Sequence, residues 1–266
     1  MTPSPAPVGD SPSGLVRRWP ASLRGRVNAV CARSLDSTQT LARRLLDRHF
    51  AEDETPEPFA VIALAQSAGL GRRGRAWSSG SGLGVWASLA VPVADRERLQ
   101  ALPMRVAVAL ADVVARVGGA ACRLKWPNDL VIGRRKLGGI LIDAVSRHDR
   151  DLWAVIGFGI NHGHGESELP APEAVSLRLA GATPLPALGE LAGATVAAVF
   201  EEIASDRPWL ERYRALTAHA AGDPIECEVA GERLAGRFAG FDERGFLRLA
   251  TAAGERVVAS GEVFSW

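Results

Sequence analysis

Three arginines lie within a glycine-rich stretch, GLGRRGRAW, at residues 69–77. The guanidinium groups of Arg72, Arg73 and Arg75 can bind phosphate or carboxylate through paired hydrogen bonds. The neighbouring glycines let backbone N–H groups approach an anion closely. The stretch is therefore predicted to hold an anion, and a solvated basic turn is the alternative interpretation.

The glycines of this stretch also follow the spacing G-x-G-x-x-G of a dinucleotide-binding turn, at Gly69, Gly71 and Gly74. That turn requires a helix to open at the third glycine, so that the helix N-terminus meets the pyrophosphate. Here the sequence continues RAWSSGSGLGVWASLAVP, rich in glycine, serine and strand-forming residues. A nicotinamide-enzyme site is therefore disfavoured. A nucleic-acid patch is also disfavoured, because the rest of the chain shows no basic stripe with interleaved aromatics.

A lysine and a carboxylate flank a predicted turn at Gly133. Lys136 follows Asp129 by seven residues, in KWPNDLVIGRRKLGG. In an extended hairpin this spacing brings the two side chains together, and the carboxylate fixes the lysine and keeps it charged. Gly138 and Gly139 leave room for a phosphate beside the lysine. An exposed hairpin lysine is the alternative interpretation.

The segment GFGINHGHG ends an apolar strand with groups that suit a flat ligand. Gly157 and Gly159 indicate close passage of a ring or of another backbone. The amide of Asn161 can read a ring edge. His162 and His164 are interpreted as loop residues, because no carboxylate or cysteine nearby in sequence completes a metal site.

The elements that must position these side chains are predicted from apolar periodicity, caps and breakers. A helix that starts in DSTQTLARRLLDRH, capped by Asp36 or Ser37, comes first. After it we expect a strand at 59–66, a strand over LGVWASLAVP, a helix that opens at Pro103 and ends at Gly118, strands broken at Pro127 and Gly133, a strand over LWAVIGFGIN, and helices near 188–204 and 208–218. From about Gly222 the alternating pattern predicts a small antiparallel barrel.

The bulk composition is that of a globular protein rather than of a membrane or nucleic-acid-binding chain. The 266 residues are 47% hydrophobic and 23% charged, with a net charge of +1. The three cysteines form no metal or disulfide pattern, and no apolar run reaches membrane-spanning length. The first residues, MTPSPAPVGDSPSG, lack a signal-peptide pattern and predict a disordered tail. We therefore expect a cytoplasmic protein.

Six motifs in order carry a family resemblance: DSTQ, QSAGLGRRGRAW, KWPND, KLGGIL, GFGIN and VSL. Together they resemble the bacterial biotin protein ligases, or biotin–[acetyl-CoA-carboxylase] ligases, strongly over about residues 34–180. The resemblance implies an α+β fold: a mixed-sheet catalytic domain of the biotin/lipoate ligase type, class II synthetase-like, followed by a small SH3-like barrel. The expected divisions are a disordered tail at 1–20, the catalytic domain at 21–220 and the barrel at 221–266.

The resemblance also implies a two-step reaction. Biotin would be activated with ATP as biotinyl-5'-AMP and then transferred to a lysine of a biotin carboxyl carrier protein or domain. ATP and biotin are thus the expected substrates, Mg²⁺ would be carried mainly by the phosphates, and no protein metal site is expected. A monomer or homodimer is expected, without DNA or membrane partners. Only 36 residues precede Ser37, too few for the DNA-binding module of some members.

Residue roles follow from the resemblance position by position. The expected catalytic residues are Lys136, Arg72 and Asp129. The expected biotin-binding residues are Ser37, Thr38, Gln39, Gln66, Leu70, Gly71, Arg72, Lys136 and Gly139. The expected nucleotide-binding residues are Arg75, Trp77, Lys125, Asn128 and Asn161.

Two positions depart from the family pattern. Gln39 stands where asparagine is usual, and Leu70 where an arginine is usual. The loss of that charge is expected to weaken retention of the adenylate, unless the backbone N–H makes the contact. Two further hypotheses therefore stay open. One is a lipoate or octanoate ligase on the related fold, and the other is a non-catalytic protein that binds biotin or a nucleotide.

Overall fold

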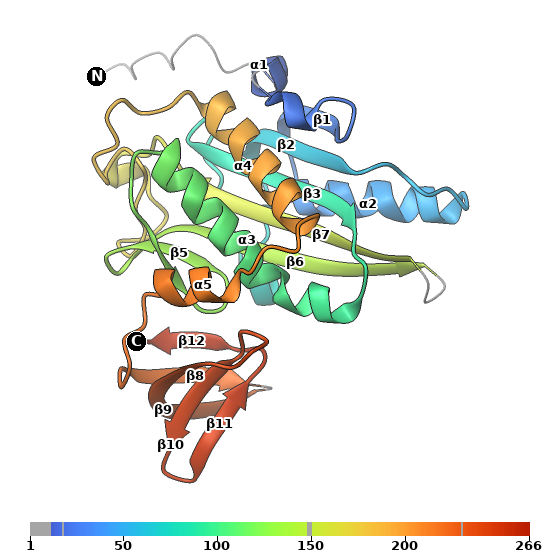
Figure 1. Cartoon of the computed structure of the whole chain (residues 1–266). Helices are drawn as coiled ribbons and strands as arrows, with labels where there is room; N and C mark the ends of the chain where they lie inside the picture. The colour runs from blue at the N-terminus through green and yellow to red at the C-terminus, as the bar shows by residue number, and fades with distance from the viewer. Residues whose placement is uncertain (1–11, 18, 148–150, 230) are drawn as a thin grey trace.

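The computed structural model describes residues 12–17, 19–147, 151–229 and 231–266. A seven-stranded mixed sheet forms the body of the molecule, and a five-stranded antiparallel sheet lies beneath one end of it (Figure 1). Helices and strands are thus combined as the predicted α+β class requires. Among the described residues, no helix has the length and apolar character needed to cross a bilayer.

The large sheet contains strands β1 to β7 in the order β1-β2-β3-β7-β6-β5-β4. Only β1 and β2 run parallel, and all other neighbours are antiparallel. The strands are β1 Asn28–Leu35, β2 Phe59–Gln66, β3 Gly84–Pro92, β4 Arg123–Lys125, β5 Asp129–Ile132, β6 Arg135–Arg147 and β7 Asp151–Asn161. The sequence prediction for β2 matches its observed bounds, because an apolar run ending in a polar residue is typical of a buried strand.

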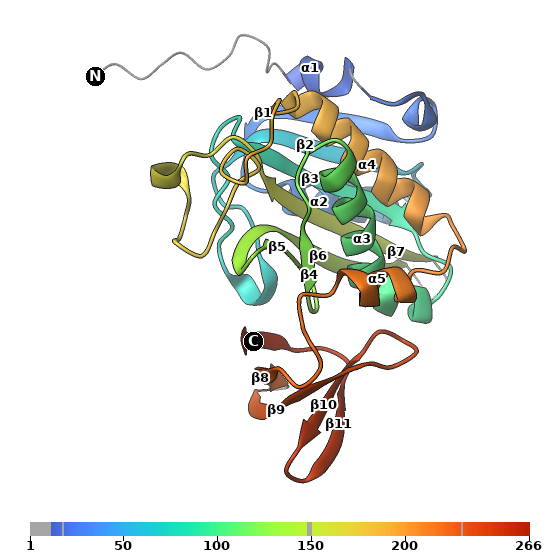
Figure 2. The same ribbon diagram turned by 60° about the vertical axis from the view of Figure 1, so that its left-hand side comes forward.

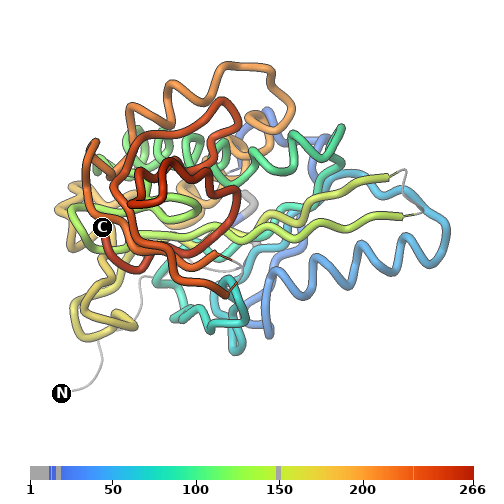
Figure 3. The backbone as a smooth tube through the Cα atoms, turned by 90° about the horizontal axis from the view of Figure 1, so that it is seen from below, coloured from blue at the N-terminus to red at the C-terminus, as the bar shows by residue number. Residues whose placement is uncertain are grey.

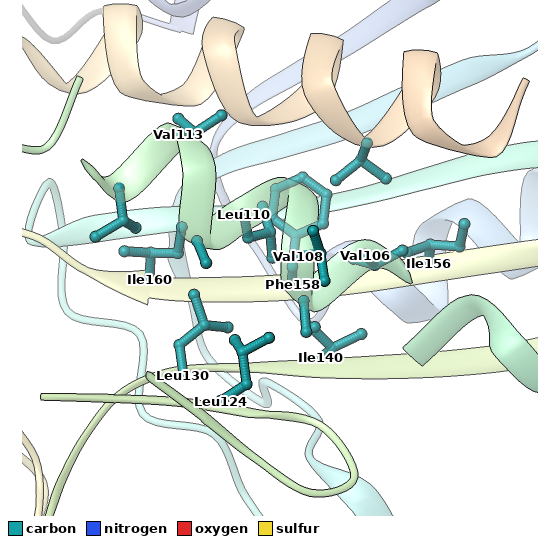
Figure 4. Close-up of a cluster of buried hydrophobic side chains, with 14 of the residues drawn as sticks. Val106, Val108, Leu110, Val113, Leu124, Leu130, Ile140, Ile156, Phe158 and Ile160 are labelled. Carbon is teal, nitrogen blue, oxygen red and sulfur yellow. The ribbon is translucent and has the colours of Figure 1, made fainter. Parts of the chain in front are cut away.

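Helices cover both faces of this sheet, which explains why its central strands are apolar on both sides. Helix α2 (Thr38–Ala51) packs on one face, where Val61 of β2 and Val155 of β7 are buried. Helices α3 (Arg96–Arg116) and α4 (Leu188–Ile203) pack together on the other face (Figure 2). On that side the main core gathers Val106 and Leu110 of α3 over Phe158 of β7 (Figure 4).

The start of α3 corrects a prediction. The helix begins at Arg96, not at Pro103, which lies inside it. The Asp95 carboxylate caps the helix by accepting from the backbone N–H of Arg98 at 2.7 Å. The residues RERLQAL before the proline are mostly good helix formers, so their propensity and this cap outweigh the one hydrogen bond that the proline cannot donate.

The N-terminal segment is ordered where the structure describes it. Pro12–Arg17 form helix α1, with Leu15 2% exposed, and Trp19 is 5% exposed. Helix α1 packs on α4, where an added Cβ on Gly189 would lie 2.9 Å from the carbonyl oxygen of Gly14. The predicted disordered tail is therefore wrong for these residues, because two large apolar side chains find a buried surface. Residues 1–11 and 18 lie outside the described residues.

The C-terminal sheet has the order β11-β10-β9-β8-β12 and is reached through helix α5 (Leu210–Leu216). Its strands are β8 Pro224–Val229, β9 Glu232–Phe241, β10 Leu247–Thr251, β11 Gly254–Val258 and β12 Glu262–Ser265. Seen from below, it lies under one end of the larger unit (Figure 3). The alternating sequence is explained by one buried face, which carries Ile225, Phe238 and Leu249. The domain limits of 21–220 and 221–266 stay a prediction.

A buried histidine joins the two sheets and should make stability depend on pH. His219 is 4% exposed, and burial, with Lys125 nearby, lowers its pKa from 6.5 to about 4. As pH falls below 6.5, His219 is protonated in the unfolded chain but stays neutral in the folded protein. The free energy of unfolding that is present above pH 6.5 is therefore lost progressively down to about pH 4. We expect this residue to contribute about 2 kcal/mol of the loss between about pH 7.5 and about pH 5.

Urea unfolding at the two pH values measures this contribution. His219→Gln keeps a hydrogen-bond acceptor but does not titrate, so the variant should lose less stability on acidification than the unaltered chain. Equal losses in the two proteins would rule out His219 as a source of the pH dependence.

Candidate functional site

One cavity collects the candidate residues predicted from the sequence. It has a volume of about 450 Å³, within the range of small-molecule sites. All fifteen predicted site residues line it: Ser37, Thr38, Gln39, Gln66, Leu70, Gly71, Arg72, Arg75, Trp77, Lys125, Asn128, Asp129, Lys136, Gly139 and Asn161. Residues up to 124 positions apart thus meet at one place, where β2, β6 and β7 adjoin the arginine loop, which we define as residues 69–77.

The buried wall of the cavity is polar but uncharged where α2 begins. Ser37 is the N-cap of α2, and its side chain accepts from the backbone N–H of Thr40. The side-chain oxygen of Gln66 accepts from the Thr38 backbone N–H at 2.7 Å, and the Gln66 amide nitrogen donates to the Ser79 hydroxyl at 2.7 Å. These bonds fix the orientation of the Gln66 amide at the end of β2.

Gln39 reaches past the cavity wall into the sheet. Its amide nitrogen donates to Asp143 at 3.0 Å and to the carbonyl of Val155 at 2.9 Å, and its oxygen lies 2.9 Å from the Ser88 hydroxyl. An added Cβ on Gly157 would come within 2.5 Å of that oxygen. The longer side chain is therefore accommodated by a glycine on β7. Sequence analysis missed Ser88, although a serine in the apolar run GVWASLAVP was a usable signal.

An indole forms the floor of the cavity. Trp77 lies against Gly159 so closely that an added Cβ there would be 2.7 Å from the indole nitrogen. The ammonium of Lys136 lies over the same ring, 5.3 Å from its centroid, and Trp86 packs edge-on at 6.3 Å. The close passage predicted from the glycines of β7 is thus made by Trp77 and, at Gly157, by Gln39.

Gly159→Ala should displace the indole floor and damage the site. The new methyl group would overlap Trp77, and overpacking of this kind costs about 1–3 kcal/mol. Biotin is the ligand expected from the sequence, and we expect its affinity, measured by calorimetry, to fall by at least about tenfold. Gly163→Ala is the matched control, because its Cβ would meet its nearest neighbour at 3.6 Å. Unchanged affinity in Gly159→Ala would show that Trp77 does not shape the binding site.

The arginine loop is a tight turn between two extended segments. The backbone N–H of Gly71 donates to the carbonyl of Arg75 at 2.7 Å, and Leu70 pairs with Ala76 in an antiparallel bridge. Arg73 and Gly74 turn the chain with φ of 56° and 72°, and the following ordered element is strand β3. The chain after the third glycine is therefore extended, so this is not a dinucleotide-binding turn.

The three arginines bind partners on other elements, including the C-terminal sheet. Arg72 donates to the Asn128 side-chain oxygen and to the carbonyl of Gly261, both at 3.0 Å. Arg73 pairs with Glu228 at 2.5 Å, and Arg75 pairs with Glu262. Burial lowers the pKa of the Arg72 guanidinium, although nearby Asp129 opposes this.

These contacts hold the arginine loop against strands β8 and β12. Glu228 and Glu262 lie more than 150 residues along the chain from the arginines. A pairing at this separation has no signal in the sequence, and sequence analysis missed both carboxylates. Leu70, the position without the usual arginine, is 43% exposed.

The lysine and carboxylate predicted to meet across the hairpin do so. Lys136 Nζ lies 2.6 Å from Asp129 Oδ1. Strands β5 and β6 form the hairpin, and a register shift between Leu130 and Val131 sets the two side chains on the cavity side. Lys125 also lines the cavity, where burial lowers the pKa of its ammonium and Asp129 opposes the change.

Asn161 has a structural role beside its place in the cavity wall. Its amide nitrogen donates to the carbonyl of Val175 at 3.1 Å, which ties the end of β7 to a neighbouring loop. The sequence predicts that the Asn161 amide contacts the edge of a ligand ring. In the structure its nitrogen already donates to Val175, so a ligand would share this group. His162 and His164 follow in a loop but are 7% and 1% exposed, and His164 packs edge-on against Trp86.

Two family models match the chain. The model described as Biotin/lipoate A/B protein ligase family matches residues 31–161, and the one described as Biotin protein ligase C terminal domain matches residues 222–266. The first span contains all fifteen cavity residues named above. The second span contains the sheet that contacts the arginine loop.

Curated relatives match over different lengths. The bifunctional ligase/repressor BirA of Bacillus subtilis is 36% identical over 137 residues, which is 51% of this chain and 41% of that protein. The biotin–[acetyl-CoA-carboxylase] ligase of Paracoccus denitrificans is 29% identical over 219 residues, which is 77% of this chain and 89% of that protein. The match thus spans about two fifths of the length of the BirA proteins.

Solved structures establish the fold. The biotin protein ligase from Aquifex aeolicus in complex with biotin and ATP has a TM-score of 0.71 at 21% identity, covering 90% of this chain and 99% of that one. The biotin protein ligase from Leishmania major in complex with biotinyl-5-AMP has a TM-score of 0.58 at 20% identity, covering 91% and 99%. The predicted fold class is confirmed.

Proposed function

This chain belongs to the biotin/lipoate A/B protein ligase family, and we propose that it is an ATP-dependent biotin–[biotin carboxyl carrier protein] ligase. One observation carries the proposal. Lys136 is held by Asp129 at 2.6 Å over the Trp77 ring, in the same cavity as Arg72. Two cations therefore adjoin a flat apolar floor and an uncharged polar wall, which suits a nucleotide phosphate next to an uncharged bicyclic ring that bears a carboxylate.

The first proposed step joins biotin to AMP. A carboxylate oxygen of biotin attacks the α-phosphorus of ATP, the bond to the bridging oxygen breaks, and pyrophosphate leaves. Negative charge spreads over the phosphate oxygens as the bond forms, so the contribution of the protein is positioned positive charge. We assign that role to Lys136 and Arg72. Mg²⁺ would arrive with ATP and be held mainly by its phosphates.

The second proposed step transfers the biotinyl group. The neutral amine of a carrier lysine attacks the carbonyl carbon of the adenylate, the bond to the phosphate oxygen breaks, AMP leaves, and the nitrogen releases one proton to solvent. Asp129 holds Lys136 in place and adds a negative charge that attracts the incoming amine. The same residue thus serves both steps of the proposed reaction.

The polar wall favours biotin over lipoate or octanoate as the substrate. Thr38, Gln39 and Ser88 are each less than 5% exposed and carry hydroxyl or amide groups. A ureido ring can exchange hydrogen bonds with such groups, whereas an alkyl chain or a dithiolane offers them none. The complexes of the Aquifex and Leishmania ligases with biotin, ATP and biotinyl-5-AMP support the same choice.

Adenylate formation tests the proposal directly. The purified chain is incubated with ATP and Mg²⁺ and with biotin, lipoate or octanoate in separate tubes, and the products are identified by mass spectrometry. We expect biotinyl-5'-AMP with biotin alone. An adenylate only with lipoate or octanoate would overturn the substrate. Folded protein that forms no adenylate would instead favour a binding protein.

Transfer needs a separate test with a carrier. After biotinyl-5'-AMP has formed, an unmodified biotin carboxyl carrier domain is added, and its mass is expected to rise by one biotinyl group. A carrier variant without the acceptor lysine is the control and should stay unmodified. ATP as a substrate, together with the three free cysteines, supports a cytoplasmic location for this reaction.

A further inference from the structure

A histidine side chain continues a backbone ladder beside the cavity. The segment 217–219 runs alongside β4, with Thr217 bridged to Leu124 and the Ala218 backbone N–H donating to the Leu124 carbonyl at 2.8 Å. One step further, the backbone N–H of Trp126 donates to Nε2 of His219 at 3.3 Å. The imidazole therefore takes the place of a strand carbonyl at the point where β4 ends.

The peptide held in this way belongs to the cavity wall. Trp126 is 1% exposed and stands between Lys125 and Pro127, and all three line the cavity. Asn128 and Asp129 follow directly, and Asn128 accepts from Arg72 at 3.0 Å. Because the Trp126 N–H is buried, loss of its acceptor would leave it unpaired, and the chain would shift to find another partner.

The C-terminal sheet encloses the imidazole. The ring of Phe238 lies 5.3 Å from that of His219, and Trp266 packs edge-on at 5.4 Å. The guanidinium of Arg134, in the β5–β6 turn, lies over the Trp266 ring at 4.9 Å from its centroid. Burial, with Lys125 adding to it and Asp223 opposing, lowers the pKa of His219, so the ring stays neutral near pH 7 and Nε2 is free to accept.

We propose that His219 is a positioning residue for the nucleotide, acting through the Trp126 peptide to place Lys125 and Asn128 in the cavity wall. The imidazole itself would touch no substrate. This inference rests on the proposed function for the identity of the ligand and adds a residue from outside the cavity. Biotin binding should depend on it much less, because Ser37, Gln66 and Ser88 lie on other elements.

Binding of a non-hydrolysable ATP analogue, measured by calorimetry, tests the inference without requiring turnover. His219→Ala removes the acceptor and should weaken analogue binding by about tenfold, while biotin affinity stays within about threefold. His219→Gln offers an amide oxygen in place of Nε2 and should restore most of the loss. An unchanged affinity in His219→Ala, or a failure of His219→Gln to restore it, would overturn the inference.

Phe238→Leu separates positioning from general loosening of the interface. This variant disturbs the same buried contact but leaves the hydrogen bond to Trp126, so it should bind the analogue normally even if its melting temperature falls. Equal weakening in Phe238→Leu would overturn the inference. If His219→Ala does not fold, His219→Asn, one methylene shorter than glutamine, takes its place and should bind less tightly than His219→Gln. Analogue binding without adenylate formation in the unaltered chain would contradict the proposed function alone.

Discussion

Lys136→Ala is expected to lower the rate of biotinyl-5'-AMP formation by at least about 100-fold, the usual effect of removing one positioned transition-state donor. The variant removes the ammonium that lies over Trp77 and leaves Asp129 as an unpaired negative charge beside the phosphates. Its melting temperature should fall only modestly, because the Lys136 side chain is 37% exposed and the cations of Lys125 and Arg72 also interact with Asp129. Mass spectrometry of the adenylate in timed samples measures the rate.

Arg135→Ala is the matched control for this variant. Arg135 is the adjacent residue of β6 but does not line the cavity; its guanidinium donates to Glu166, also outside the lining, and to the carbonyl of Ala174 in the cavity wall. Its adenylate rate should stay within about threefold of the unaltered chain. A folded Lys136→Ala protein that keeps full activity would contradict the role given to this lysine, and an unfolded one would show that the residue is needed for structure.

Arg72→Ala should be the second severe variant, because it removes both a charge and an anchor. The guanidinium joins the arginine loop to Asn128 and to the carbonyl of Gly261 in the C-terminal sheet. We expect the rate of adenylate formation to fall by about 100-fold and the KM for ATP to rise. Steady-state pyrophosphate release at varied ATP concentrations separates the two effects.

Arg73→Ala tests whether the loss is specific to Arg72. Arg73 lies next in the chain and pairs with Glu228 and Glu262, but it does not line the cavity. Its removal should alter the adenylate rate by less than about threefold, since exposed pairs of this kind contribute little. If both variants lost activity equally, general disorder of the loop, rather than the Arg72 charge, would be the cause.

Local features of the fold were predictable because they depend on residues close together in the chain. The alternation and apolar runs predicted β2, β3 and β7, and the cap at Ser37 predicted the start of α2. The turn at Gly133 predicted the meeting of Asp129 and Lys136, and in the structure a register shift between Leu130 and Val131 brings the two side chains together. The predicted site residues share one cavity for a related reason: most of them stand at strand ends or in the loops next to them.

Two predictions were wrong because a specific contact overrode the average behaviour that composition predicts. Leu15 and Trp19 lie in a segment rich in proline, serine and glycine, yet both are buried where the N-terminal segment adjoins α4. Pro103 suggests a helix start, but the cap at Asp95 lies about two helical turns earlier and sets the true boundary. Composition predicts the average behaviour of a segment, and it does not show whether one side chain is buried elsewhere in the fold or caps a helix.

The sequence by itself determined strands β2, β3 and β7, the capped helix α2, the pair of Asp129 and Lys136 and the family, because each depends on residue types at short and regular spacing. Only the tertiary structure decided that Glu228 and Glu262 form ion pairs with the arginine loop. It also decided that Gln39 forms hydrogen bonds with Asp143 and Ser88, and that His219 accepts from the Trp126 backbone N–H. These partners lie on different elements and far apart in the chain. Their contacts exist only once helix α2 and the C-terminal sheet have packed against the large sheet, and no local pattern of residues encodes that packing.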